Sequence, residues 1–136
     1  MTTKDYMSVT LEHGSHEPDS RYCLMEAVAW FANEPWSDSP QCVSPVLAAF
    51  GRAWNDGMRS DKEREQLKPY IPRLIGTSDP QLEGSRAFMV LDWLIRTCLP
   101  TWLSQSSTLE QYAPPLVTAS PIQNLSTLTL AREPLD

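Results

Sequence analysis

The residues of this chain that are best suited to chemistry are concentrated between His13 and Pro45. The segment holds both histidines, two of the three cysteines, two tryptophans and several acidic side chains. Imidazole and thiolate groups bind zinc, histidine and carboxylates transfer protons, and cysteine can act as a nucleophile. We therefore expect any metal or catalytic site to lie in this segment.

Four side chains of the segment form a candidate zinc site: His13, His16, Cys23 and Cys42. Four such ligands would close a tetrahedral structural site, in which Glu26 or Asp38 could replace one ligand. Bound zinc would tie an N-terminal arm and a proline-rich loop to the first helix. The spacing differs from that of known zinc motifs, because no two cysteines form a CxxC pair. The alternative is that both cysteines are small buried hydrophobic residues.

Two catalytic interpretations use the same residues. Cys23 or Cys42 could act as a nucleophile with a histidine base that Asp38 orients. A reactive thiol needs electropositive surroundings, however, and this segment is acidic. Glu26 and Asp38 could form a general acid–base pair, although nothing in their spacing brings them together. The sequence therefore predicts no catalytic residue, and a small Cys/His enzyme is only the third interpretation of function.

A second group of candidates lies in the middle third of the chain, where basic residues are most frequent. These residues are Arg52, Arg59, Lys68, Arg73, Arg86 and Arg96. Guanidinium groups stacked on aromatic rings can bind phosphates and nucleotides, and Trp54 and Tyr70 lie near them in sequence. We therefore predict a ligand site that includes Arg52, Trp54 and Arg73. The alternative is that the arginines form ion pairs with neighbouring acidic residues.

Trp36 is the candidate anchor for a protein partner, because it stands between Pro35 and Ser37 in a loop and is predicted to be exposed. Tryptophan is enriched among the residues that dominate binding energy at interfaces. Asp38 would add a negative charge beside it. The alternative is that Trp36 covers the hydrophobic core.

Composition limits the class of protein. The chain has 136 residues and a net charge of −6 at pH 7, which disfavours binding to nucleic acid or anionic membranes. No apolar run approaches the ~20 residues of a membrane span, and the N-terminus lacks the apolar core of a secretory signal. Three cysteines without such a signal indicate free thiols in a reducing cytoplasm.

Apolar spacing and capping residues predict an all-α fold. Residues 79–99 show the strongest helical period, and a first helix is expected from Asp19 or Ser20 to Ala32. Further helices are expected where capping residues occur: Ser44-Pro45, Ser60-Asp61-Lys62-Glu63, Ser107-Thr108-Leu109-Glu110 and Ser120-Pro121. We expect a compact domain of about five helices packed around the helix at 79–99.

The same apolar spacing and capping residues predict how the chain is organised. Residues 1–18 form an arm, 19–131 a single helical domain, and 132–136 a tail. No internal repeat and no low-complexity segment interrupts the helical domain.

Several short motifs carry a resemblance to a group of proteins: Cys23-Leu-Met-Glu-Ala-Val-Ala29, Glu34-Pro-Trp-Ser-Asp38, Cys42-Val-Ser-Pro45, Ala49-Phe50, Trp54-Asn-Asp56 and Ile71-Pro-Arg-Leu74. With these motifs the chain resembles uncharacterised small helical proteins of actinobacteria and their phages, which share a His-Gly-Ser-His start. The likeness covers residues 13–103 and implies a common helical fold without an established activity. The C-terminal third, rich in Ser, Thr and Pro, departs from the group.

These observations predict a cytoplasmic, non-enzymatic binding or regulatory protein that acts through protein–protein contact at residues 13–43. The alternative is a metal- or small-molecule-binding protein, with zinc bound by His and Cys or a nucleotide bound by Arg. The sequence predicts a protein partner, no nucleic acid, no membrane and no cofactor other than the candidate zinc. It leaves a homo-oligomer open.

Overall fold

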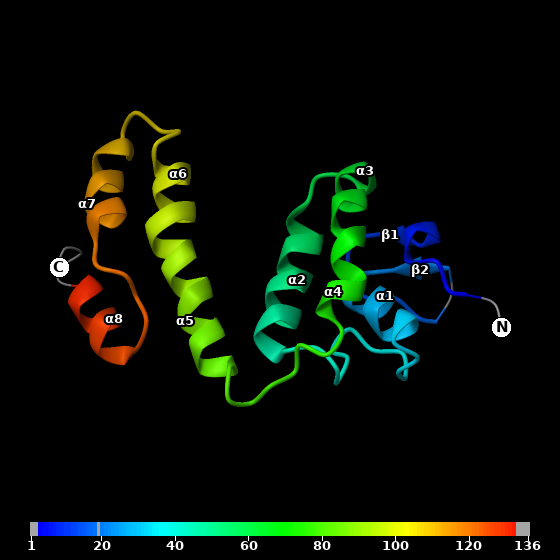
Figure 1. The fold of residues 1–136 in the computed structure, drawn as a ribbon. Helices are drawn as coiled ribbons and strands as arrows, with labels where there is room; N and C mark the ends of the chain where they lie inside the picture. Colours follow the sequence, from blue (N-terminus) through cyan, green and yellow to red (C-terminus); the bar gives the residue numbers. More distant parts are fainter. Residues whose placement is uncertain (1–2, 19, 133–136) are drawn as a thin grey trace. The chain divides into compact units, whose positions relative to one another are not determined.

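The computed structural model describes residues 3–18 and 20–132, and its mainly helical content confirms the all-α prediction (Figure 1). The chain divides into two compact units, which we call unit 1 (Met1–Pro80) and unit 2 (Gln81–Asp136). The predicted arm therefore belongs to unit 1. The helix cap predicted at Asp19 and the tail beyond Arg132 lie outside the described residues. None of the helices in 3–18 and 20–132 combines the length and apolar character that crossing a membrane requires.

Unit 1 begins with a short turn and two strands. The 3-10 turn η1 spans Tyr6–Ser8, strand β1 spans Thr10–Leu11, and strand β2 spans Arg21–Tyr22. The strands are parallel, with Leu11 opposite Tyr22. Parallel strands need a crossover between them, and its described residues, 12–18 and 20, include both histidines. The predicted candidate segment thus begins as a crossover loop.

The rest of unit 1 is helical: α1 (Leu24–Phe31), α2 (Pro45–Gly57), α3 (Asp61–Arg64), the 3-10 helix η2 (Glu65–Tyr70) and α4 (Ile71–Leu74). Ser44 caps α2 as predicted, because its hydroxyl accepts a hydrogen bond from Leu47 N at 3.3 Å. Helix α1 starts later than predicted, because β2 occupies the residues before it and Cys23 is its N-cap.

The main hydrophobic core lies in unit 1 around α1. Residues 24–29 are all buried, and side chains from the arm, α2, η2 and α4 pack around them. Helix α2 approaches α1 closely at Gly51, where an added Cβ would lie 2.8 Å from Met25 Cε. Leu67 and Ile71 close the core from η2 and α4 and are fully buried.

Unit 2 is built on one long helix formed by α5 (Glu83–Trp93), the π-helical turn η3 (Leu94–Cys98) and α6 (Leu99–Leu103) (Figure 1). The helix begins later than the predicted 79–99 segment and continues past Pro100. A proline in a helix lacks its N–H and clashes with the carbonyl one turn earlier. The π turn widens the backbone at this point, with Leu99 N bonded to Leu94 O, so the helix continues.

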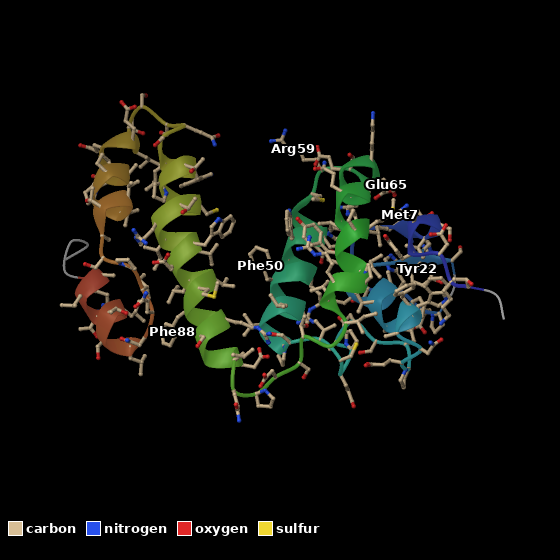
Figure 2. All side chains as sticks on the ribbon, viewed as in Figure 1. Met7, Tyr22, Phe50, Arg59, Glu65 and Phe88 are labelled. Carbon is tan, nitrogen blue, oxygen red and sulfur yellow. The ribbon has the colours of Figure 1, made fainter. Side chains whose placement is uncertain are left out.

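Three further elements complete unit 2: η4 (Glu110–Tyr112), α7 (Ala113–Thr118) and α8 (Leu125–Arg132). Helix α7 packs on α6 and the π turn. Asp92 Oδ1 accepts a hydrogen bond of 2.7 Å from Ile122 N, which ties the segment before α8 to the long helix. Figure 2 shows Phe88 on the side of α5 that faces α8. The inner side of the long helix therefore contacts α7 and the chain leading to α8.

Candidate functional site

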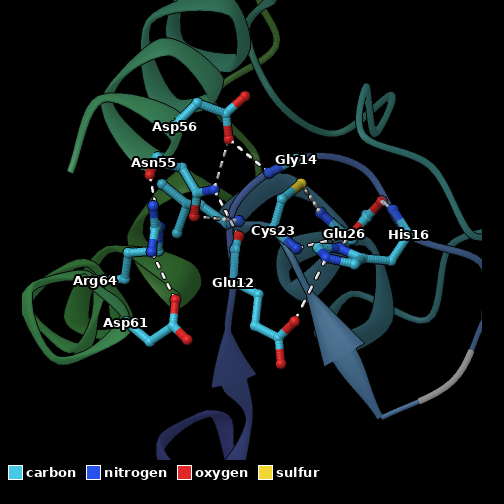
Figure 3. Close-up of polar contacts among 10 residues, drawn as sticks. Glu12, Gly14, His16, Cys23, Glu26, Asn55, Asp56, Asp61 and Arg64 are labelled. Carbon is cyan, nitrogen blue, oxygen red and sulfur yellow. Dashed lines mark hydrogen bonds and ion pairs between the residues drawn. The ribbon is translucent and has the colours of Figure 1, made fainter. Parts of the chain in front are cut away.

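The predicted candidate segment forms a polar network at the N-terminus of α1, centred on Glu26, which is 1% exposed (Figure 3). Its carboxylate accepts hydrogen bonds from His16 N at 2.6 Å and Cys23 N at 2.7 Å. His16 Nδ1 lies 2.9 Å from Glu26 Oε2, and because a carboxylate only accepts, Nδ1 is the donor. Glu26 N donates to Cys23 Sγ at 3.4 Å, which completes a capping box.

Asn55, at the end of α2, forms the second half of the network and is fully buried. Its Oδ1 accepts from Leu24 N at 3.2 Å, and its Nδ2 donates to Glu12 O at 2.9 Å. Its neighbour Asp56 accepts from Gly14 N at 2.9 Å. The pKa of Asp56 is lowered, because these hydrogen bonds and the nearby charges outweigh the opposing effect of its partial burial. One side chain from α2 thus joins the arm to the start of α1.

Arg64 extends the network to the C-terminus of α2. Its guanidinium donates to Asn55 O and Met58 O, each at 2.8 Å, and to Asp61 Oδ1 at 2.6 Å. These bonds satisfy carbonyls that a helix end leaves without intrahelical partners. Within the described part of the chain, the buried side-chain nitrogen or oxygen without a partner is Arg96 Nε, which lies in unit 2 and outside this network. The buried side-chain nitrogen and oxygen atoms of this network therefore all have hydrogen-bond partners within the protein.

The four predicted zinc ligands lie in three different places. His16 and Cys23 both contact Glu26, but His13 acts on Asp56, and the Cys42 thiol bonds to Glu34. Across residues 3–18 and 20–132, no three His, Cys, Asp or Glu side chains form a group that could hold a metal ion. The structure thus does not bring the predicted ligands together, because Glu26 binds His16 and Cys23 while Glu34 binds Cys42 at another place.

Both candidate nucleophiles are in environments that favour the neutral thiol. Burial raises the pKa of Cys23 to about 12. Burial and the hydrogen bond to Glu34 also raise the pKa of Cys42. The candidate acid–base pair is not assembled either, because Asp38 bonds to Ser15 and Ser39 while Glu26 is held by the groups described above. The arrangement supports a structural role for these groups.

Trp36, the predicted partner anchor, is less exposed than the sequence predicts. Trp36 is half-buried rather than exposed, because its Nε1 donates to His16 O at 2.8 Å and its ring lies 5.1 Å from that of Tyr22. The indole covers the crossover loop. A hollow of about 400 Å³ lies nearby, and neither Trp36 nor Asp38 lines it; its residues are Glu34, Pro35, Ser37, Ser39, Pro40 and Gln41.

The predicted ligand residues are only partly brought together. Arg52 donates to Asp38 O at 2.9 Å and to Ser39 Oγ at 3.1 Å, so it holds the loop. Trp54 and Arg73 instead both contact Tyr70, at 5.9 Å from ring to ring and 5.4 Å from ring to guanidinium. Tyr70 lies outside the predicted three-residue set, although the sequence already places it near these arginines.

Unit 2 has an exposed apolar surface that was not predicted from the sequence. Along the long helix and just before it, large apolar residues are exposed; we call them the apolar helix surface: Leu82, Met89, Trp93, Leu94, Leu99 and Trp102. Met89 is 70% exposed and Trp102 is 60% exposed. The signal was present in the sequence, because this helix has apolar residues on more than one face, whereas an ordinary surface helix has one apolar stripe.

The charged residues of the long helix pair with each other. Arg86 lies 2.9 Å from Glu83, and Arg96 lies 3.2 Å from Asp92. Both pairs are one helical turn apart, so each charge is balanced within the helix. The apolar helix surface therefore lies on a helix without net charge.

Comparison of the chain with protein-family models, with curated proteins and with solved structures finds no match. The resemblance to small helical proteins of actinobacteria and their phages stays a prediction. Function must accordingly be argued from the geometry of the described residues.

Proposed function

We propose that this protein is a cytoplasmic, non-enzymatic binding or regulatory protein that acts through protein–protein contact, with the apolar helix surface as its contact region. The observation that carries the proposal is the exposure of Met89 and Trp102, 70% and 60%, on one helix. Large exposed apolar patches on soluble proteins usually mark interaction sites. Tryptophan and methionine are also enriched at interfaces. The cytoplasmic setting is supported by the free cysteines Cys23, Cys42 and Cys98.

The contact region differs from the one that the sequence predicts at residues 13–43. In that segment the polar groups are bonded to one another and Trp36 is half-buried. Apolar surface that stays in water forgoes roughly 25 cal/mol for each Å² that a partner could cover. A partner would therefore gain more on unit 2, where the side chains of Met89 and Trp102 are accessible.

The chemistry of the surface limits the kind of partner. The ion pairs Glu83–Arg86 and Asp92–Arg96 leave no uncompensated charge along the helix. A strongly charged partner would find no opposite charge here and would lose hydration on binding. The surface fits a partner with an apolar helix or groove.

The experiment places a photo-crosslinking amino acid at Leu99, inside the surface, and in a second protein at Leu125, which is 73% exposed on α8. We expect crosslinks to one protein from position 99 and none from position 125. With that protein purified, Met89→Asp should raise the dissociation constant at least about tenfold, equivalent to a loss of roughly 1.4 kcal/mol of binding free energy. Leu125→Asp is the matched control and should leave it unchanged. Equal effects of the two substitutions would contradict the proposal.

A second candidate function, binding of a planar anionic ligand, is favoured by the row Trp54–Tyr70–Arg73. Trp54 is 43% exposed and Tyr70 is 39% exposed, so both rings are accessible for stacking. A nucleotide panel tested by thermal shift should raise the melting temperature of the native protein, and Arg73→Ala should abolish the rise. Arg52→Ala is the control, since Arg52 bonds to the loop at Asp38. An unchanged melting temperature across the panel would exclude this candidate.

A further inference from the structure

We propose that residues 4–8, which we call the strap, close over an ammonium-binding site at the end of α1, and that a lysine-bearing segment of a protein partner takes this site when the strap opens. The site belongs to unit 1 and shares no residue with the apolar helix surface. The inference therefore goes beyond the proposed function and does not depend on it.

The ammonium group of Lys4 shows what kind of group the site accepts. Its Nζ donates to Trp30 O and, at 2.6 Å, to Asn33 Oδ1, and it lies 4.9 Å from the centroid of the Trp30 ring. A cation is attracted by the face of an aromatic ring and by the partial negative charge at the C-terminus of a helix. Asn33 has a φ of 59°, the left-handed conformation that often ends a helix. The end of α1 thus offers two oxygen acceptors and a ring to one ammonium group.

Tyr6 provides the second contact of the strap. Its ring meets that of Phe31 edge to face, with 5.5 Å between the centroids. Asp5, between Lys4 and Tyr6, has an extended backbone, and side chains two residues apart in an extended chain lie on the same side. The strap therefore presents an ammonium group and an aromatic ring together to α1. A partner segment needs the same pair, which is a lysine followed two residues later by an aromatic residue.

The strap can open without disturbing the core of unit 1. Each residue from 4 to 8 is exposed or half-buried, whereas Val9 and Leu11, which follow, are 6% and 0% exposed. The strap is also held at its far end, where Lys68 Nζ donates to Met7 O at 3.1 Å. Segments with few buried contacts open locally at a small cost in free energy. The hinge then lies just before Val9, and the buried arm residues keep their places.

Charge favours a cationic segment as the partner. Residues 1–80 contain twelve acidic and eight basic side chains. Complementary charge speeds encounter between partners and suppresses binding of the wrong ones. Unit 1 therefore attracts a segment that carries lysine and repels one that is acidic.

The test uses two peptides with blocked ends. One has the sequence of residues 3–8 of this chain, and the other has alanine in place of its lysine. Each is titrated into the full-length wild type and into the full-length Lys4→Ala/Tyr6→Ala variant, and binding is followed by NMR at the Trp30 indole. A tethered strap competes at an effective concentration on the order of millimolar. We expect the lysine peptide to bind the variant at least about tenfold more tightly than the wild type, and at least about tenfold more tightly than the alanine peptide does.

The matched control is Lys62→Ala/Tyr112→Ala, which makes the same two changes at exposed residues outside the strap. It should bind the lysine peptide as the wild type does. Circular dichroism checks that both variants keep their helix content, and Lys4→Ala alone replaces the double variant if the latter unfolds. Equal affinity of the two peptides, equal affinity of variant and wild type, or no binding to the folded variant overturns the inference. Crosslinking from position 99 tests the proposed function on other residues, so either can fail while the other stands.

Discussion

The two units of this protein differ in where they place their large apolar side chains. Unit 1 surrounds α1 with a core, and its exposed large hydrophobic residues are three among those described: Met7, Trp54 and Tyr70. Among its described residues, unit 2 exposes ten large hydrophobic side chains: Leu82, Met89, Trp93, Leu94, Leu99, Trp102, Tyr112, Val117, Leu125 and Leu130. Unit 1 therefore buries most of its large apolar side chains, whereas unit 2 leaves many of its own exposed.

Residue types that are suited to chemistry do not by themselves make a functional site. His16, Cys23 and Glu26 have such side chains, yet in unit 1 they bond to one another and to backbone groups. Buried polar groups are costly unless they are hydrogen-bonded, so a small core that contains them must satisfy them internally. In the long helix of unit 2 the charged side chains form two short-range ion pairs, and large apolar side chains are exposed.

The largest expected effect comes from removing the centre of the unit 1 network. Glu26→Ala leaves His16 and the Cys23 N–H without their acceptor in a buried place, and we expect the free energy of unfolding to fall by about 3–5 kcal/mol. Urea unfolding followed by circular dichroism measures it. Glu110→Ala, at an exposed site in unit 2, is the control and should change stability by less than about 0.5 kcal/mol. Equal losses of unfolding free energy in the two variants would mean that the buried network of unit 1 contributes no more to stability than an exposed site in unit 2.

A smaller effect is expected from pH, through Cys23. Its pKa is raised from 9.0 to about 12 by burial, so the unfolded chain releases this proton near pH 9 while the folded chain retains it. The contribution is fully present below pH 9 and falls by about 1.4 kcal/mol per pH unit as pH rises toward 12. Comparing the wild type with Cys23→Ser isolates this slope, because all other groups titrate in both. Identical alkaline curves would mean that the Cys23 thiol is accessible in the folded protein.

Local signals in the sequence predicted the helices whose caps lie beside them. Ser44 and Ser60 both cap helices as expected, because a cap and the N–H group it accepts from are only a few residues apart. The C-terminal helix begins instead after Asn124, whose Oδ1 accepts from Thr127 N, because the predicted Ser120-Pro121 segment is not helical. Continuation of the long helix through Pro100 was also missed, since the π turn that permits it has no clear sequence signature.

The polar network around Glu26 and Asn55 is formed by contacts between residues that are distant in sequence, and these contacts could not be predicted. His16 meets Glu26 because the parallel pairing of Thr10 with Arg21 folds the crossover back over α1. Asn55 joins that loop from the end of α2. The closeness of His16 and Cys23 in sequence therefore suggested a metal or catalytic site. Their hydrogen bonds to Glu26 in space instead indicate a structural role.

The smallest expected effect compares one glycine from each unit. Gly51 faces the core, where an added Cβ would lie 2.8 Å from Met25 Cε, while Gly84 in α5 has no atom within 4 Å of that position. Replacing a helical glycine by alanine gains about 0.5–1 kcal/mol when space is free, and overpacking a core costs about 1–3 kcal/mol. Gly84→Ala should therefore raise the urea midpoint and Gly51→Ala should lower it. If both substitutions raise the midpoint, the Met25 side chain moves to accommodate the added methyl group. Close packing of α2 on α1 then does not distinguish the core of unit 1 from the exposed helix of unit 2.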